Sequence, residues 1–198
     1  MHQLATEHNL PWSVLTKHHL DSIGIGSDSE VNNIHKVAFE RLKDIFHQNS
    51  FEEINSDHSK LRTYAKLKTE IGMEEYLDSI KNIKDRTALT KIRLSNHDLM
   101  IEKGRHQGLQ ENLRLCPFCD NKIENEQHFI IECHTYNVLR QPLFTSMAEI
   151  NNEFDTLNDE RKFCFLLTSP DARKKISEYL NKTLQIRKYL IENHKQNG

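Results

Sequence analysis

Three cysteines and one histidine near the middle of the chain have the spacing of metal ligands. Cys116 and Cys119 form a C-x2-C pair, and His128 and Cys133 follow after eight and four further residues. A C-x2-C turn aims both sulfurs at one point, and structural Zn²⁺ sites are closed tetrahedra of sulfur and nitrogen ligands. A Cys3His set fills all four positions and leaves none open for a substrate. The sequence therefore predicts one structural zinc ion bound by Cys116, Cys119, His128 and Cys133.

Other readings of the cysteines and of the histidine ligand stay open. His134 could replace His128 as the ligand, although adjacent ligands at 133 and 134 are harder to close around one ion. In a secreted protein the four cysteines could form two disulfides, but Met1 to Pro11 contains no apolar run typical of a signal peptide. We expect an intracellular protein, cytoplasmic or nuclear, in which thiols stay reduced. The fourth cysteine, Cys164, is expected to be a buried apolar residue.

Basic residues concentrate ahead of the cysteines. The net charge of the chain is -2, but residues 57–114 hold 12 Lys and Arg against 9 Asp and Glu. Such side chains could follow the phosphates of RNA or single-stranded DNA, contacts that give affinity without sequence preference. An ordinary solvated helix face is the alternative, because Glu70, Glu74 and Asp98 interrupt the basic residues. The candidate nucleic-acid-binding residues are Lys60, Arg62, Lys66, Lys91, Arg93, Lys103, Arg105 and Arg114.

Helices are expected to position these residues. Only 6 Gly and 4 Pro argue against a turn-rich β fold, and apolar residues recur at helical intervals through residues 31–46 and 172–191. A short helix is expected from Glu126 to Cys133. The segment from Leu99 through Gly104 and Gly108 to the cysteines is expected to be an extended or irregular link. No run of about 18 apolar residues predicts a membrane span. We predict a mainly α protein with a small Cys3His zinc module between helices, divided into an N-terminal helical region (1–112), the zinc module (113–150) and C-terminal helices (151–198).

The segment around the cysteines also resembles a known family. Leu115-Cys-Pro-Phe-Cys-Asp120 and Glu126-Gln-His-Phe-Ile-Ile-Glu-Cys133 are similar to the zinc-binding region that follows the polymerase domain of non-LTR (LINE-type) retrotransposon reverse transcriptases. Helical stretches on both sides are similar too, so the resemblance covers roughly residues 10–188. It implies that the four matched residues bind metal and that the chain contacts nucleic acid, as a stand-alone or truncated piece of a retroelement protein.

The resemblance does not extend to catalysis. Reverse transcriptases hold two Mg²⁺ ions with paired aspartates, and this chain contains no Asp-Asp dipeptide. Pro170-Asp171 is the only Pro-Asp, the motif of some retroelement endonucleases, and it serves naturally as a helix start. We therefore expect a nucleic-acid-binding accessory module, not an enzyme, without a small-molecule substrate. The competing hypothesis is a protein-interaction adaptor, in which zinc locks the helices together and the amphipathic last helix binds a partner protein.

Overall fold

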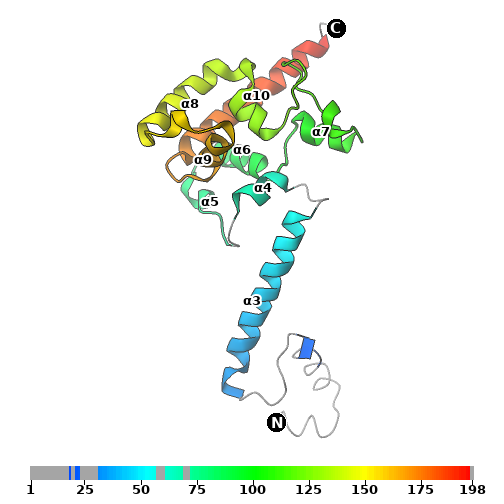
Figure 1. Ribbon diagram of the computed structural model, residues 1–198, viewed down its shortest axis with the longest axis vertical. Helices are drawn as coiled ribbons and strands as arrows, with labels where there is room; N and C mark the ends of the chain where they lie inside the picture. The colour runs from blue at the N-terminus through cyan, green and yellow to red at the C-terminus, as the bar shows by residue number, and fades with distance from the viewer. Residues whose placement is uncertain (1–17, 19–20, 23–30, 57–60, 69–71, 197–198) are drawn as a thin grey trace. The chain divides into compact units, whose positions relative to one another are not determined.

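A computed structural model describes residue 18, residues 21–22, 31–56, 61–68 and 72–196 of the chain. The protein is mainly helical, as the sequence predicted (Figure 1). Its contacts divide it into two compact units, residues 1–56 and 57–198. In the first unit the main described element is α3 (Val31–Asn55). None of the described helices is long and apolar enough to cross a lipid bilayer.

The second unit contains the predicted metal ligands and a series of short helices that ends in one long helix. Its elements are α4 (Arg62–Leu67), α5 (Tyr76–Ser79), α6 (Ile83–Arg93), α7 (Met100–His106), the 3-10 turn η1 (Glu111–Leu113), the π-helical turn η2 (His128–Glu132), the 3-10 turn η3 (His134–Tyr136), α8 (Asn137–Ile150), the 3-10 turn η4 (Phe154–Thr156), α9 (Asp159–Thr168) and α10 (Arg173–Gln196).

The core of this unit forms around α10. Helix α10 packs against α6, α8 and α9, and η2 packs against α9. Buried apolar side chains come from all of these elements, so the segment around the cysteines contributes to the common core. Fully buried members are Leu89, Ile92, Phe129, Ile130, Tyr136, Met147, Leu166, Ile176 and Leu180. The division of the sequence at 113 and 150 stays a prediction, since compactness of 57–198 does not show which segments fold by themselves.

Helix α7 occupies part of the segment that was expected to be an extended or irregular link. Leu99 precedes it in an extended conformation and supplies no side-chain cap. The cap comes from a distant residue: the backbone N–H of Met100 donates to Glu124 Oε2 at 2.7 Å, and that of Ile101 donates to the Glu124 carbonyl at 3.1 Å. A carboxylate at a helix N-terminus satisfies its unpaired N–H groups. This helix start could not be predicted from the local sequence, because its cap lies more than twenty residues away.

Glu124 also joins the metal-ligand segment to the last helix. Arg187 of α10 donates from Nε to Oε1 at 2.7 Å and from Nη2 to Oε2 at 2.6 Å. Both side chains are almost completely buried, at 1 % exposure for Glu124 and 5 % for Arg187. A buried carboxylate needs such partners, because transfer of an unpaired charge out of water is strongly unfavourable.

Substituting Arg187 tests how strongly this buried pair holds the fold. The Arg187→Met protein keeps Glu124 buried without its cation, so we expect the free energy of unfolding to fall by about 3–5 kcal/mol. The neighbouring Lys188→Met protein is the control, because Lys188 is exposed and reaches Glu192 only at 3.9 Å; its change should stay below about 1 kcal/mol. Urea unfolding followed by circular dichroism measures both, and equal midpoints for the two variants would contradict a structural role for the pair.

Candidate metal centre

Cys116 and Cys119 lie at the tip of a short hairpin. Leu115 and Ile123 form an isolated antiparallel bridge, and the Cys116 N–H donates to the Lys122 carbonyl at 2.7 Å. Asn121 turns the chain with a φ of 52°, in the left-handed region that Asn tolerates better than most residues. The hairpin therefore closes on itself and presents the C-x2-C pair on one side.

His128 and Cys133 lie at the two ends of the π-helical turn η2. The Cys133 N–H donates to the His128 carbonyl at 2.7 Å, an i→i−5 bond, and the His128 N–H donates to Asn125 Oδ1 at 2.7 Å. In an α-helix, residues five apart are rotated by about 140° from one another. The wider π-turn reduces this rotation, so both side chains can face the hairpin. The expected short helix from Glu126 to Cys133 is present, with this wider winding.

The hairpin and the π-turn bring the four predicted ligands together. One ligand atom each from Cys116, Cys119, His128 and Cys133 lies within 4.8 Å of the others, so this group could hold a metal ion. The Sγ atoms of Cys116 and Cys119 lie 4.0 and 3.6 Å from Sγ of Cys133. Sulfurs around tetrahedral zinc, with bonds of about 2.3 Å, are about 3.8 Å apart, whereas a disulfide requires about 2.05 Å. The spacing therefore fits coordination, and all the thiols are free.

Contacts within the group shift the pKa values of Cys116, Cys133 and His128. A hydrogen bond with Cys133, together with burial, raises the pKa of the Cys116 thiol, and the same hydrogen bond lowers the pKa of the Cys133 thiol. Burial acts to lower the pKa of His128, but contacts with Cys133 and Glu132 outweigh it and raise that pKa. Metal ligands must be deprotonated thiolates and neutral imidazole, and a bound cation replaces the protons that these groups share.

The imidazole of His128 has no hydrogen-bond partner although it is buried. Neither ring nitrogen forms a hydrogen bond with any described residue, and Nδ1 lies 3.5 Å from Glu132 Oε2, in ion-pair range but too far for a good hydrogen bond. Buried polar atoms are nearly always satisfied. A metal ion at the centre of the group would satisfy one nitrogen, and Glu132 could orient the ring through the other.

His134, the alternative ligand, lies beside this group and is not part of it. Its side chain is exposed, and its Nδ1 lies 3.7 Å from Cys119 Sγ. The four-residue group is complete with His128, whose imidazole is buried.

Arg140 supports the ligand segment, and sequence reasoning missed it. From the first half of α8 it donates to the carbonyls of Ile130 at 2.8 Å and of Cys133 at 2.6 Å, and it is buried. Its guanidinium thus fixes the end of η2, next to Cys133. Nothing in the local sequence distinguishes this arginine from an ordinary helix residue, because both acceptors are backbone atoms.

Four of the predicted nucleic-acid-binding residues have internal partners. Arg62 pairs with the carboxylates of Glu102 and Glu126, and Arg105 pairs with Glu102 at 2.8 Å. Arg93 is buried and donates to the Leu167 carbonyl and, at 2.7 Å, to Glu74. Arg114 donates to the carbonyls of Leu109 and Ile101. These guanidinium groups hold the fold together, and little of their hydrogen-bonding capacity is left for phosphates.

The remaining candidates are lysines. Lys66, Lys91 and Lys103 are exposed, and none of them has an ion pair among the described residues. Lys60 lies outside the described residues. The structure therefore leaves three candidate phosphate contacts, from α4, α6 and α7.

The Glu74 network predicts a measurable pH dependence of stability. Glu74 accepts from Lys68 at 2.7 Å, Arg93 at 2.7 Å and Tyr64 at 3.2 Å. Burial acts to raise the pKa of Glu74, but the hydrogen bond from Lys68 and the charge of Arg93 outweigh it, so the pKa is lowered. A lowered folded-state pKa contributes stability above the unfolded-state pKa, and this contribution disappears as the pH falls through the folded-state value.

We therefore expect the Glu74→Gln protein to be less stable than the parent at neutral pH. The difference should shrink as the pH falls from about 5 toward 3, since the ordinary pKa of a glutamate is about 4.3. Glu75→Gln is the matched control, because Glu75 is exposed and its ion pair with Arg173 is a surface pair of small energy. Urea unfolding of the parent and both variants over this pH range measures the effect. A difference between Glu74→Gln and parent that is constant with pH would contradict it.

Comparisons with protein-family models, with curated proteins and with solved structures find no match for this chain. The function therefore has to be argued from the residues of the site and their surroundings.

Proposed function

We propose that this protein is a zinc-binding, nucleic-acid-binding accessory module of retrotransposon reverse-transcriptase origin that lacks catalytic residues. The observation that carries the proposal is the convergence of Cys116, Cys119, His128 and Cys133, whose ligand atoms lie within 4.8 Å of one another. The same four positions carry the resemblance to the zinc-binding region after the polymerase domain of LINE-type elements.

Zinc is the metal that this ligand set favours. Three thiolates and one imidazole are soft and borderline ligands, and a tetrahedral arrangement of them is typical of Zn²⁺. Bound zinc would supply a cross-link between the hairpin and η2, and a closed Cys3His set offers no position for a substrate. Because Phe129, Ile130 and Tyr136 beside the ligands are buried in the common core, the cross-link would stabilise the packing of the surrounding helices as well as the hairpin.

Charge placement supports binding to a single-stranded nucleic acid. Residues 57–114 are net positive, and Lys66, Lys91 and Lys103 are exposed there without ion pairs among the described residues. Contacts from lysines to phosphates provide affinity that depends on salt and little on sequence. With four arginines engaged internally, the interface is smaller than the sequence suggested, so we propose weak binding to RNA or single-stranded DNA.

A protein-interaction adaptor is the second candidate function, and one observation favours it. Helix α10 exposes Ile186 and Tyr189 at 36 % and 64 % of their surfaces. Residues three apart lie on one face of a helix, so these two side chains form a small apolar surface that a partner protein could cover.

Zinc analysis of purified protein tests the metal site. We expect one zinc ion per chain in the parent and in the His134→Ala protein. The Cys116→Ser and His128→Ala proteins should lose it, because a Cys3His site needs all four ligands for high affinity. His134→Ala is the matched control for a neighbouring histidine. Loss of zinc from His134→Ala with retention in His128→Ala would show that the ligand histidine is His134, and full occupancy in the Cys116→Ser protein would contradict the site altogether.

Salt-dependent binding to a labelled single-stranded RNA tests the second half of the proposal. Three phosphate contacts on a single strand give a slope of about -2 in the logarithmic salt plot, so a fourfold rise in salt should weaken binding about twentyfold. The Lys66→Gln/Lys103→Gln protein should flatten the slope by about 1.4. The control is Lys174→Gln/Lys182→Gln, which removes two exposed lysines of α10. No binding by the parent at 50 mM salt would favour the adaptor function.

A further inference from the structure

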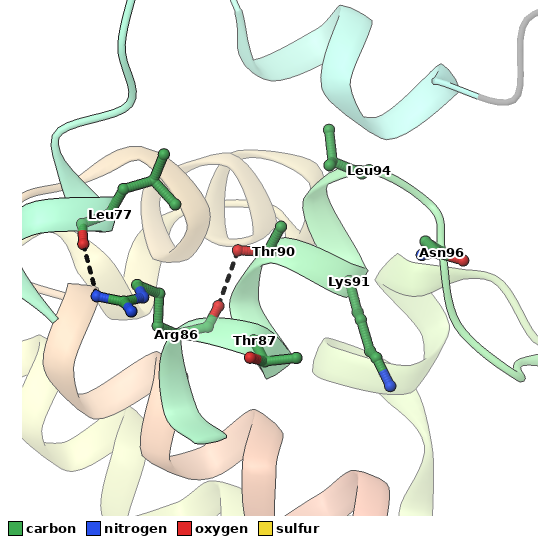
Figure 2. Close-up of a pocket in the computed structure, with 7 residues that line it drawn as sticks. All are labelled: Leu77, Arg86, Thr87, Thr90, Lys91, Leu94 and Asn96. Carbon is green, nitrogen blue, oxygen red and sulfur yellow. Dashed lines mark hydrogen bonds between the residues drawn. The ribbon is translucent and has the colours of Figure 1, made fainter. Parts of the chain in front are cut away.

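A small pocket on the outer face of α6 is separate from the metal-ligand group. Its volume is about 220 Å³. Residues of α5 and α6 and of the segment that follows α6 form its wall (Figure 2). The lining residues are Leu77, Arg86, Thr87, Thr90, Lys91, Leu94 and Asn96.

The polar lining of this pocket is suited to an anion. It contains two cations, Arg86 and Lys91, together with hydroxyl and amide groups, and no carboxylate. Neither cation takes part in an ion pair among the described residues. The neighbouring acid, Asp85, is buried on another side of α6, where it accepts from Asn181 at 2.7 Å. The positive charge of the pocket is therefore not neutralised by its own walls.

The guanidinium of Arg86 is held in place before any ligand binds. Its Nη1 donates to the carbonyls of Leu77 at 2.9 Å and of Ile80 at 3.3 Å, at the end of α5. Thr90 donates its hydroxyl to the Arg86 carbonyl at 2.9 Å, as Figure 2 shows. An immobilised side chain loses less conformational entropy on binding than a free one. In the same view Thr87 lies between Arg86 and Lys91, whose charged ends point in different directions.

The size of the pocket indicates what kind of molecule would carry the anion. Sites for whole small molecules have volumes of about 300–1,000 Å³, and this pocket is smaller. It fits one group of a longer chain. The half-buried Leu94 and the exposed Leu77 add an apolar surface in the same pocket, against which a sugar or base next to a phosphate could pack.

We propose that this pocket binds the backbone of a single-stranded nucleic acid, with Lys91 on one phosphate, Arg86 on a neighbouring phosphate, and Leu77 and Leu94 beside the sugar or base between them. The inference rests on the proposed nucleic-acid function and gives it a location. It adds Arg86 to the interface, a residue that was not among the eight candidates from the sequence.

Charge substitutions inside the pocket test this assignment in the full-length, zinc-loaded protein. Thr87→Glu places a carboxylate between the two cations, and Thr87→Gln is its neutral control of the same size. Lys91→Gln removes one cation, and Lys182→Gln on α10 is the control for loss of one exposed lysine. The probes are a labelled 12-nucleotide RNA and the DNA of the same sequence, measured by fluorescence anisotropy at several salt concentrations. An oligoglutamate peptide serves as a competing acidic chain.

We expect Lys91→Gln to weaken the binding of both nucleic acids about fourfold at 0.15 M salt and to flatten the salt slope by about 0.7, the contribution of one phosphate contact. Thr87→Glu should weaken binding at least as much, while Thr87→Gln and Lys182→Gln stay within twofold of the parent. Backbone amide shifts on RNA addition should concentrate in residues 86–96. Circular dichroism and zinc content should be unchanged in all variants.

These measurements distinguish a failure of the pocket assignment from a failure of the proposed nucleic-acid-binding function. If the parent binds RNA but Lys91→Gln and Thr87→Glu bind like their controls, the pocket assignment is wrong and the nucleic-acid function stands. Displacement of the RNA by oligoglutamate at equal charge concentration would overturn the assignment in favour of an acidic peptide. If the parent binds neither nucleic acid at 50 mM salt, both proposals fall.

Discussion

Glu124 has to be paired because its carboxylate is buried at the junction of three elements. It accepts hydrogen bonds from Nε and Nη2 of Arg187 in α10, and it caps the start of α7 through the Met100 N–H. It also follows Ile123, which pairs with Leu115 in the hairpin of Cys116 and Cys119. Desolvation of an ionised carboxylate is tolerated only when such partners are in place. The position of the last helix, the start of α7 and the orientation of the hairpin therefore depend on one another through a single side chain.

The four predicted metal ligands lie on segments that are held by further hydrogen bonds beside those of Glu124. Glu126, two residues beyond Glu124, accepts from Arg62, Ser95 and His97, and Arg140 holds the carbonyls of Ile130 and Cys133. The backbone that carries Cys116, Cys119, His128 and Cys133 is thus held by the buried Arg140 and, through Glu126, by the partly exposed Arg62. Such a scaffold preorganises the thiols, so metal binding would require little rearrangement, and the metal in turn would stabilise the core to which Phe129 and Ile130 belong.

Internal pairing also decides which charges are available to a partner. Arg62, Arg93, Arg105 and Arg114 look like a basic surface when the sequence is read alone, yet each donates to a carboxylate or a carbonyl within the fold. The planar guanidinium forms several hydrogen bonds at once, which makes arginine the residue of choice for such buried pairs. Lysine, a flexible and strongly hydrated cation, stays on the surface, and Lys66, Lys91 and Lys103 are exposed without ion pairs among the described residues.

By itself, the sequence predicted the helical class of the protein and pointed to the four residues that converge, with His134 left open as an alternative to His128. Apolar periodicity and the spacing of Cys116, Cys119, His128 and Cys133 are local signals, and a C-x2-C turn or a helical stripe has the same meaning in any fold. Only the tertiary structure decided that α7 starts at Met100, that His134 stays outside the four-residue group, and that four arginines donate to partners within the fold. Most of these outcomes depend on distant partners that no local pattern reveals, such as Glu124 for Met100 and Glu126 for Arg62. Arg105 and Arg114 are exceptions in part, because Glu102 and the Leu109 carbonyl lie only three and five residues away. The cap at Glu124 and the carbonyls that Arg140 holds become neighbours only when α10 and η2 pack into the common core.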